Sequence, residues 1–349
     1  MSGKLRYGCV GAGGIANKKH LNEYSKLQNV EMVAICDTNR SAAEKMAEKF
    51  NIPQVYTDYH EMFEKASLDL VSVCTPNYLH MPVSVDALKA GIHVHCEKPV
   101  AMNHEEAQLL AEAKNKYGRK IMVALNNRFT SEAAFVKKYV EAGMLGEIYH
   151  AKCGWRRRNG IPGKGAWFTN KQLSGGGPLI DLGVHFLDLT LFFMGYPVAA
   201  SVVGTTYSKF PDSSTRIRPG YKIVGDGIFD VEDMAVGFVR LENDATIDFE
   251  FSWASNIEKE CKYYEILGTK GGVSYANGEL KIFSEVMGTS VNIVPELNGT
   301  IQTVNEFQHF TDCIINGREP IAPVEEAVRL MKIIDAIYKS AETRREVLL

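Results

Sequence analysis

Short apolar segments alternate with amphipathic ones through the first 125 residues, and this alternation constrains the fold more than any other feature. The apolar segments contain few polar side chains, as do strands of a parallel sheet that is buried on both faces. The segments between them repeat apolar residues at helical spacing. The pattern predicts a doubly wound α/β domain. Its predicted strands are residues 4–10, 31–37, 54–58, 68–76, 91–99 and 120–127.

A glycine-rich turn joins the first predicted strand to the first helix. Gly11, Gly13 and Ala16 occupy the three small positions of the dinucleotide fingerprint, with alanine in the third place. Such a turn lets the backbone approach a pyrophosphate and directs the N–H groups of a helix N-terminus at its charge. A glycine turn without a ligand is the alternative. The predicted cofactor contacts in the turn are Gly11, Gly13, Gly14 and Ile15.

A carboxylate follows the second predicted strand. Asp37 lies where its side chain can accept hydrogen bonds from both hydroxyls of an adenosine ribose. A carboxylate there also repels a 2′-phosphate, so it favours NAD over NADP. Arg40, three residues later, keeps NADP as the alternative, because a guanidinium can accommodate that phosphate. We therefore predict that residues 1–125 form a dinucleotide-binding domain for NAD.

Polar residues gather after two later strands. The carboxyl ends of the strands line the ligand crevice of a doubly wound sheet, so polar residues there are candidates for cofactor and substrate contact. A metal site close by is disfavoured, because His93 and His95 share one face of a strand while Cys96 points to the other. The predicted contacts are Thr75, Asn77, His80, Glu97 and Lys98.

An aspartate and a histidine interrupt a long apolar segment in the middle of the chain. Asp181 and His185, in LIDLGVH, are four residues apart, so a helix brings both onto one face. A carboxylate that orients an imidazole makes a general base, and the alternative is a histidine satisfied within the core. Asp188, three residues beyond His185, is the rival of Asp181 for the orienting role.

Beyond residue 125 the alternation of strands and helices stops. Strand-like segments follow one another, with a hairpin turn at 242–245 and two more strands around Gly271 and Gly272. This pattern predicts an antiparallel sheet. Residues 126–349 are therefore expected to form a second domain for substrate binding and oligomerisation. An open sheet face tends to be buried against a partner, so a homo-oligomer is expected.

The stretch WRRRNGIPGKGAWFTN, residues 155–170, combines aromatic rings with cationic donors, as carbohydrate pockets do. The alternative is a solvated basic strand with one ring in the core. Guanidinium groups also bind phosphate and carboxylate, which leaves an anionic substrate open. The predicted substrate contacts are Arg128, Trp155, Arg156, Arg158 and Trp167, together with Lys98, Asp181 and His185.

Composition disfavours several classes of function. The 349 residues carry a net charge of -3, and 45% are hydrophobic, so the charge balance favours neither nucleic acid nor a membrane surface as a partner. No apolar run reaches the length of a membrane span, and the first residues lack the features of a signal peptide, so a cytoplasmic protein is expected. Four of the seven cysteines fall in apolar segments and are expected to be reduced and buried: Cys9, Cys36, Cys74 and Cys96.

Four motifs together resemble the Gfo/Idh/MocA family, the glucose-fructose oxidoreductase and inositol dehydrogenase group. They are GAGGIA, TPNYLH, EKPVAMN and GGGPLIDLGVH, and the likeness extends to SAETRREVLL. The resemblance implies a Rossmann domain followed by an α/β domain with an open, mostly antiparallel sheet, and a dimer or tetramer. It also implies that Lys98 is the active-site lysine, that the Lys98–Pro99 bond is cis and that Glu97 contacts the nicotinamide ribose. Asp181 and His185 match the substrate-side pair of that family.

These residues permit oxidation of a secondary hydroxyl of a sugar or cyclic polyol, such as an inositol, a hexose or a hexose phosphate. His185 is the predicted base, because its ordinary pKa suits proton exchange near neutrality. Asp181 would hold the imidazole tautomer and Lys98 would donate to the substrate oxygen, although Lys98 as the base stays open. The alternatives are an NADH-dependent keto-sugar reductase, a glycosidase with a retained NAD, and a non-catalytic NAD-binding regulator of a sugar pathway.

Overall fold

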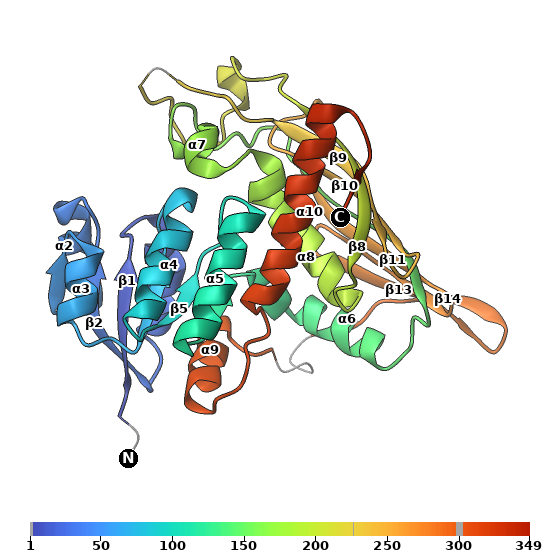
Figure 1. Ribbon diagram of the computed structural model, residues 1–349. Helices are drawn as coiled ribbons and strands as arrows, with labels where there is room; N and C mark the ends of the chain where they lie inside the picture. The colour runs from blue at the N-terminus through green and yellow to red at the C-terminus, as the bar shows by residue number, and fades with distance from the viewer. Residues whose placement is uncertain (1–2, 226, 298–302) are drawn as a thin grey trace. The chain divides into compact units, whose positions relative to one another are not determined.

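The computed structural model describes residues 3–225, 227–297 and 303–349 (Figure 1). The chain forms two compact units. The first comprises Met1–Leu125 and Val304–Val328, and the second comprises Asn126–Thr303 and Arg329–Leu349. The sequence predicted two consecutive segments divided after residue 125. The structure has a boundary at that residue, but it returns Val304–Val328 to the first unit.

The first unit is built on a parallel sheet of six strands among the described residues, as the alternating pattern predicts. Its strand order, β3-β2-β1-β4-β5-β6, is that of a dinucleotide-binding fold. Every residue of β4 is buried, which explains why its sequence is apolar rather than alternating. The strands are β1 (Leu5–Val10), β2 (Val30–Cys36), β3 (Gln54–Tyr56), β4 (Leu70–Val73), β5 (His93–Cys96) and β6 (Ile121–Val123).

Short polar side chains begin the helices of this unit. The side chains of Asn39, Asp58 and Asn103 each accept a hydrogen bond from a backbone N–H of the first helical turn. Gly118 ends the longest of these helices with a φ of +60°, which glycine adopts without strain. The helices are η1 (Ala16–His20), α1 (Leu21–Tyr24), α2 (Arg40–Phe50), α3 (Tyr59–Lys65), η2 (Asn77–Leu79), α4 (His80–Lys89) and α5 (His104–Tyr117).

Helix α9 (Glu306–Ile315) joins the first unit from a distant part of the sequence. Glu306 forms a hydrogen bond with His95 Nε2 at 3.3 Å. The ring of Phe307 lies 5.0 Å from that of Tyr24 and 5.3 Å from that of His20. These contacts are long-range, so local sequence patterns could not reveal that α9 packs here. Helix α10 (Val324–Thr343) follows and supplies residues to both units.

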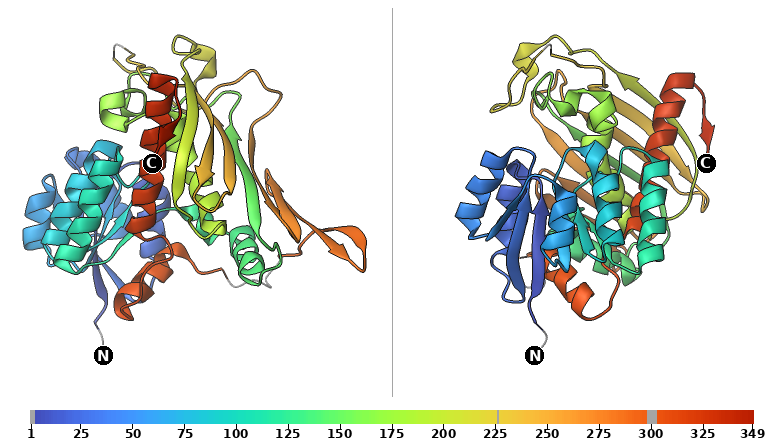
Figure 2. Two further views of the ribbon diagram at one scale, coloured as in Figure 1. Left: turned by 45° about the vertical axis from the view of Figure 1, so that its right-hand side comes forward. Right: turned by 60° about the vertical axis from the view of Figure 1, so that its left-hand side comes forward.

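The second unit contains a mixed sheet of nine strands within the described residues, in the order β14-β13-β12-β11-β7-β10-β9-β8-β15. Strand β10 pairs in parallel with β7, and the other pairs are antiparallel, so the antiparallel prediction holds for all pairs but one. The β13–β14 hairpin extends beyond its neighbours (Figure 2). The strands are β7 (Ile148–Arg156), β8 (Ala199–Tyr207), β9 (Met234–Leu241), β10 (Thr246–Ser252), β11 (Cys261–Gly268), β12 (Gly271–Ala276), β13 (Glu279–Val286), β14 (Thr289–Ile293) and β15 (Val347–Leu348).

A buried helix lies in the core of the second unit. It consists of η5 (Leu179–Gly183), one turn with π-helical bonding, and α8 (Val184–Phe193). His185 is the one residue of α8 that is not buried. The longer segment Lys171–Phe193 is apolar enough to span a membrane, which the sequence analysis did not expect, yet 89% of its most apolar window is buried within the structure. Its hydrophobicity therefore matches that of a core helix. The remaining helices are η3 (Asn126–Phe129), α6 (Ser131–Glu141), η4 (Trp167–Thr169), α7 (Lys171–Ser174) and η6 (Ser214–Arg216).

The cysteines agree with the expectation of reduced core thiols. All seven lie in the described part of the chain without a disulfide, and Cys261 is the one that is not fully buried. Burial raises the pKa of the Cys36 and Cys96 thiols to about 12, so both are protonated near neutral pH.

Candidate active site

The glycine turn of the first unit is fixed by contacts within the protein. Gly11 has a φ of +100°, and a Cβ there would lie 2.5 Å from the backbone oxygen of Cys74, so only glycine fits. The carboxylate of Asp37 accepts hydrogen bonds of 2.8 Å from the backbone N–H groups of Ala12 and Asn39. The acid at the end of β2 is therefore held directly against the turn.

Several features of this edge fit a bound dinucleotide. A Cβ built on Gly13 or Gly14 meets no protein atom within 4 Å, so the protein itself leaves that space open for a ligand. The buried Oγ1 of Thr75 has no hydrogen-bond partner among the described residues. Arg40, the residue that kept NADP open, forms an exposed ion pair of 2.8 Å with Glu44. Ile15, at the helix N-terminus, is 38% exposed.

Two strand-end loops of the first unit are joined through a histidine. His80 is buried, with Nδ1 2.6 Å from the backbone oxygen of Pro99 and Nε2 2.8 Å from that of Thr75. Burial lowers the pKa of His80. The Lys98–Pro99 bond is cis, as the family resemblance implies. Asn77 is buried at the start of η2, in the loop after β4.

Glu97 is held by a second histidine that sequence reasoning did not single out. His20 Nε2 lies 2.9 Å from Glu97 Oε1, and His20 Nδ1 lies 2.8 Å from the hydroxyl of Ser72. Burial alone would raise the pKa of Glu97, but the hydrogen bond and charge of His20, with Lys98 and His80, lower it to about 2. Glu97 is therefore a fixed carboxylate directly before Lys98 in the loop after β5. Its Oε2 accepts a hydrogen bond of 3.2 Å from the backbone N–H of Lys98.

The His93, His95 and Cys96 group has structural partners. His93 Nδ1 accepts a hydrogen bond of 2.9 Å from the backbone N–H of Lys120, and His95 Nδ1 lies 2.8 Å from the hydroxyl of Tyr24. Among the residues that the structure describes, no group of three or more His, Cys, Asp or Glu side chains could hold a metal ion.

In the second unit, Asp181 and His185 come from successive turns of the buried helix, Asp181 from η5 and His185 from α8. Asp181 Oδ2 accepts a hydrogen bond of 2.9 Å from the indole Nε1 of Trp253, which is fully buried. The ring of Trp155 lies 6.0 Å from that of His185. Turns with π-helical bonding are frequent at functional sites, because they change the direction in which side chains leave a helix.

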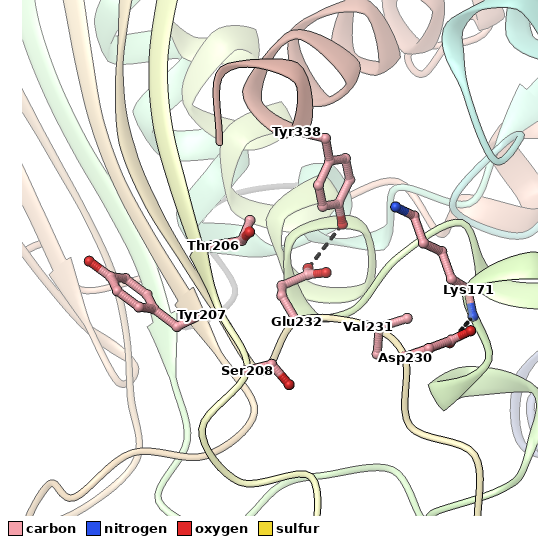
Figure 3. A pocket seen from close by; sticks show the side chains of 8 residues that line it. All are labelled: Lys171, Thr206, Tyr207, Ser208, Asp230, Val231, Glu232 and Tyr338. Atoms are coloured by element: carbon pink, nitrogen blue, oxygen red, sulfur yellow. Dashed lines mark hydrogen bonds between the residues drawn. The ribbon is translucent and has the colours of Figure 1, made fainter. Parts of the chain in front are cut away.

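Two glycines before this helix lie so close to other residues that a side chain would not fit. A Cβ on Gly176 would lie 2.0 Å from the hydroxyl of Tyr338, and a Cβ on Gly177 would lie 2.0 Å from the backbone oxygen of Glu232. The Glu232 carboxylate accepts hydrogen bonds from the N–H groups of Gly177 and Leu179 and from the Tyr338 hydroxyl, the last of which is drawn in Figure 3. Burial raises the pKa of Glu232, while the backbone bonds oppose that rise. Glu232 thus fixes the start of the helix that carries Asp181 and His185.

Arg128 and Asp188 form an ion pair in the core. Arg128 donates to Asp188 through Nε at 2.8 Å and through a terminal nitrogen at 2.5 Å, and Tyr196 donates to the same carboxylate at 2.8 Å. Arg128 is 2% exposed and Asp188 1%. This is the geometry of a structural pair in the core, whereas the sequence analysis predicted that Arg128 contacts the substrate. It also gives Asp188 a task other than the orientation of His185.

The arginines after Trp155 divide between two faces of β7. Trp155 packs edge-on against Phe186 of α8, with ring centroids 5.8 Å apart, so its face of the sheet meets the helix. Arg156 pairs with Glu250 at 3.2 Å, and its side chain leaves the opposite face because neighbouring residues of a strand alternate. Arg158 is exposed and donates to the backbone oxygen of Glu258. Strand alternation therefore separates Arg156 from Trp155, and Arg158 lies beyond the end of β7 in an exposed position.

Sequence reasoning missed Trp253, which donates to Asp181, and Arg157, which packs on Trp155. Strand alternation from Trp155 was the available signal for Arg157, because residues two apart share a face. Trp253 continues the buried series Phe249 and Phe251, but its bond to Asp181 depends on the tertiary fold. Trp167 stacks on Phe168 with ring centroids 3.7 Å apart, and its predicted substrate contact stays a prediction.

Comparison with known proteins places this arrangement among oxidoreductases. The chain is 32% identical to the D-glucoside 3-dehydrogenase of Escherichia coli over 99% of its own length and 98% of that protein. It is 26% identical to the glucose-6-phosphate 3-dehydrogenase of Bacillus subtilis, over 88% of this chain and 85% of that one. A solved structure of levoglucosan dehydrogenase in complex with NADH and levoglucosan has the same fold, with a TM-score of 0.86, 21% identity and coverage of 99% of both chains.

Two family models account for nearly the whole chain. Residues 5–125 match the NAD-binding Rossmann domain of an oxidoreductase family, and residues 137–349 match the C-terminal alpha/beta domain of the same family. The motifs around the glycine turn, Lys98, Asp181 and His185 lie within these two matches. The protein belongs to the Gfo/Idh/MocA family of NAD-binding oxidoreductases.

Proposed function

We propose that this protein oxidises a ring hydroxyl of a sugar, at position 3 of a glucoside-like substrate, with NAD in preference to NADP. The observation that carries the proposal is the Asp181 carboxylate, fixed by Trp253 and placed four residues before His185 on a buried helix. The position follows two relatives, which are named as a D-glucoside 3-dehydrogenase and a glucose-6-phosphate 3-dehydrogenase.

The preference for NAD rests on Asp37 and Arg40. The Asp37 carboxylate is fixed against the glycine turn, where it suits the two ribose hydroxyls and opposes a 2′-phosphate. The guanidinium of Arg40 is engaged by Glu44. NAD, when bound, supplies the acceptor for the hydride that leaves the substrate carbon.

The protein residues handle the proton and the charge on oxygen. In this proposal His185 takes the hydroxyl proton, and Asp181 favours the imidazolium that results. Lys98 donates a hydrogen bond to the same substrate oxygen and stabilises its alkoxide character. The same groups would serve reduction of a ketone in the reverse direction.

The test is a spectrophotometric assay of NADH formation by the purified protein with NAD and NADP in parallel. The substrates are glucosides, free hexoses, hexose phosphates, uronic acids and inositols, and the oxidised position is read from the product by NMR. Sugar-dependent NADH formation supports a dehydrogenase. Turnover of a glycosidic bond without net NADH would favour the retained-cofactor glycosidase, and NADH binding without any turnover would favour the keto-sugar reductase or the regulator.

We further propose a homo-oligomer formed through the sheet face opposite α8. The strand register sets Lys281, Ser274, Glu265, Lys152 and Asp248 side by side across this face, so the charges along the row alternate in sign, which suits pairing with a second copy. Val203 on the same face is 47% exposed. Light scattering after gel filtration measures the mass directly, and a monomer at micromolar concentration contradicts the proposal.

A further inference from the structure

Arg157 is a buried cation that the proposed reaction does not use. Its side chain is 8% exposed, and its guanidinium carbon lies 4.5 Å from the ring centroid of Trp155. Gly160 leaves room for it, because a Cβ on Gly160 would come within 2.3 Å of Arg157 Cδ. The guanidinium is therefore packed within the protein and does not extend into solvent.

The guanidinium is only partly satisfied by the protein. Among the residues that the structure describes, its side-chain partner is Glu260, whose Oε1 lies 3.4 Å from Nε. A guanidinium carries five N–H donors in a planar fork, so four of them belong to the terminal nitrogens. The ion pair with Glu260 involves Nε, so the terminal N–H groups are available to a ligand.

The surroundings of Arg157 include the groups assigned to the chemistry. The negative charges of Asp181 and Glu260 act on Arg157 and oppose the fall in its pKa that burial causes. Trp155 donates to Glu260 at 2.6 Å, and its ring lies 6.0 Å from His185. One cluster of the second unit therefore combines hydrogen-bond donors, carboxylate acceptors and an indole ring.

We propose, building on the function proposed above, that Arg157 binds hydroxyl groups of the sugar. Neighbouring hydroxyls of a sugar both donate and accept, so they match a guanidinium that lies beside a carboxylate. Two further cations lie nearby, Lys262, whose Nζ is 5.9 Å from the Trp155 ring, and the exposed Arg218.

The experiment compares three neighbouring arginines in the full-length protein. Arg157→Gln removes the cation that faces the cluster, while Arg156→Gln and Arg158→Gln are matched controls on the opposite face and in the exposed loop. Each variant is assayed with methyl glucoside, glucose 6-phosphate and glucuronate, with KM and kcat separated. NADH binding is measured by fluorescence, and thermal unfolding shows whether each variant is folded. Arg157→Lys keeps the charge and serves as a second variant if Arg157→Gln does not fold.

Arg157→Gln should raise KM for methyl glucoside by about 10- to 100-fold, the loss of a charged hydrogen bond, with NADH binding unchanged. The controls should stay within about twofold of the wild type, as expected for surface changes. An equal loss in the control variants, or a wild-type preference for the phosphate that Arg157→Gln abolishes, would overturn the inference.

Direct binding separates this inference from the proposed reaction. If the wild type oxidises none of the sugars, thermal shifts with methyl glucoside in the presence of NADH still report binding. A shift seen in the wild type and lost in Arg157→Gln supports the role of Arg157 although the proposed oxidation fails. If methyl glucoside neither shifts the unfolding temperature of the wild type nor is oxidised by it, both proposals are contradicted.

Discussion

The two sheets present candidate functional residues in different ways. In the parallel sheet of the first unit, the polar residues follow the strands, as Asp37 follows β2 and Lys98 follows β5. In the mixed sheet of the second unit, they lie on or just after β7 and alternate between faces, as Trp155 and Arg156 do. An error of a residue or two in a predicted strand end does not change which polar residues are candidates for the ligand crevice. The same error in a strand moves every side chain to the opposite face of the sheet, so the predicted face is then wrong.

The largest expected effect compares one candidate from each unit. Lys98→Met and His185→Ala should each lower turnover by about 10²- to 10⁴-fold, the usual contribution of acid–base and charge stabilisation. NADH binding, measured by fluorescence, should remain in both variants. Wild-type turnover in either variant would remove that residue from the mechanism. Asp188→Asn is a poor control here, because it would disturb the buried ion pair with Arg128. The exposed Arg158→Gln is the reference.

The second prediction concerns the buried pair of the second unit. Asp188→Ala should lower the free energy of unfolding by roughly 3–5 kcal/mol, because it leaves the Arg128 guanidinium buried without its carboxylate. The double variant Arg128→Met with Asp188→Ala should recover part of that loss, since no charge is then stranded. Urea unfolding measures both. A cost below about 1 kcal/mol for the single variant would show that the pair is not the structural element described here.

The third prediction tests the strand-end acid of the first unit. Asp37→Ala should shift the ratio of NADH to NADPH affinity by about tenfold towards NADPH, the value of roughly one charged hydrogen bond. Glu44→Gln releases Arg40 and should move the same ratio by a smaller amount. Fluorescence titration with both reduced cofactors gives the ratios. An unchanged ratio in Asp37→Ala would mean that the carboxylate serves only the turn.

The smallest effect concerns a histidine at the start of β5. Burial, with the nearby charges of Arg119 and Lys120, lowers the pKa of His93 from 6.5 to about 4. Between these values the unfolded chain binds a proton that the folded chain does not, so stability is full above pH 6.5 and falls as the pH drops towards 4. His93→Gln should make unfolding temperatures less dependent on pH in that window. Identical slopes for variant and wild type would refute the assignment.

Sequence reasoning located the first unit well because its signals are local. The glycine turn, the acid after β2 and the loop before Lys98 each depend on neighbouring residues, and the structure places them on the predicted elements. The helix that carries Asp181 and His185 was predicted for the same reason. Its bond to Trp253 was not, because Trp253 lies 72 residues later in the chain.

The amino-acid sequence by itself determined the family, the parallel sheet and the places of Lys98, Asp181 and His185, because strand and helix periodicity and short motifs act over a few residues. Only the tertiary structure decided which arginine packs on Trp155, that Arg128 is bound to Asp188, and that α9 returns to the first unit. These outcomes depend on strand register and on which surfaces pack against each other and are buried from water. Such choices are made between distant segments, where hydrophobic burial and ion pairing act without any local sequence signal.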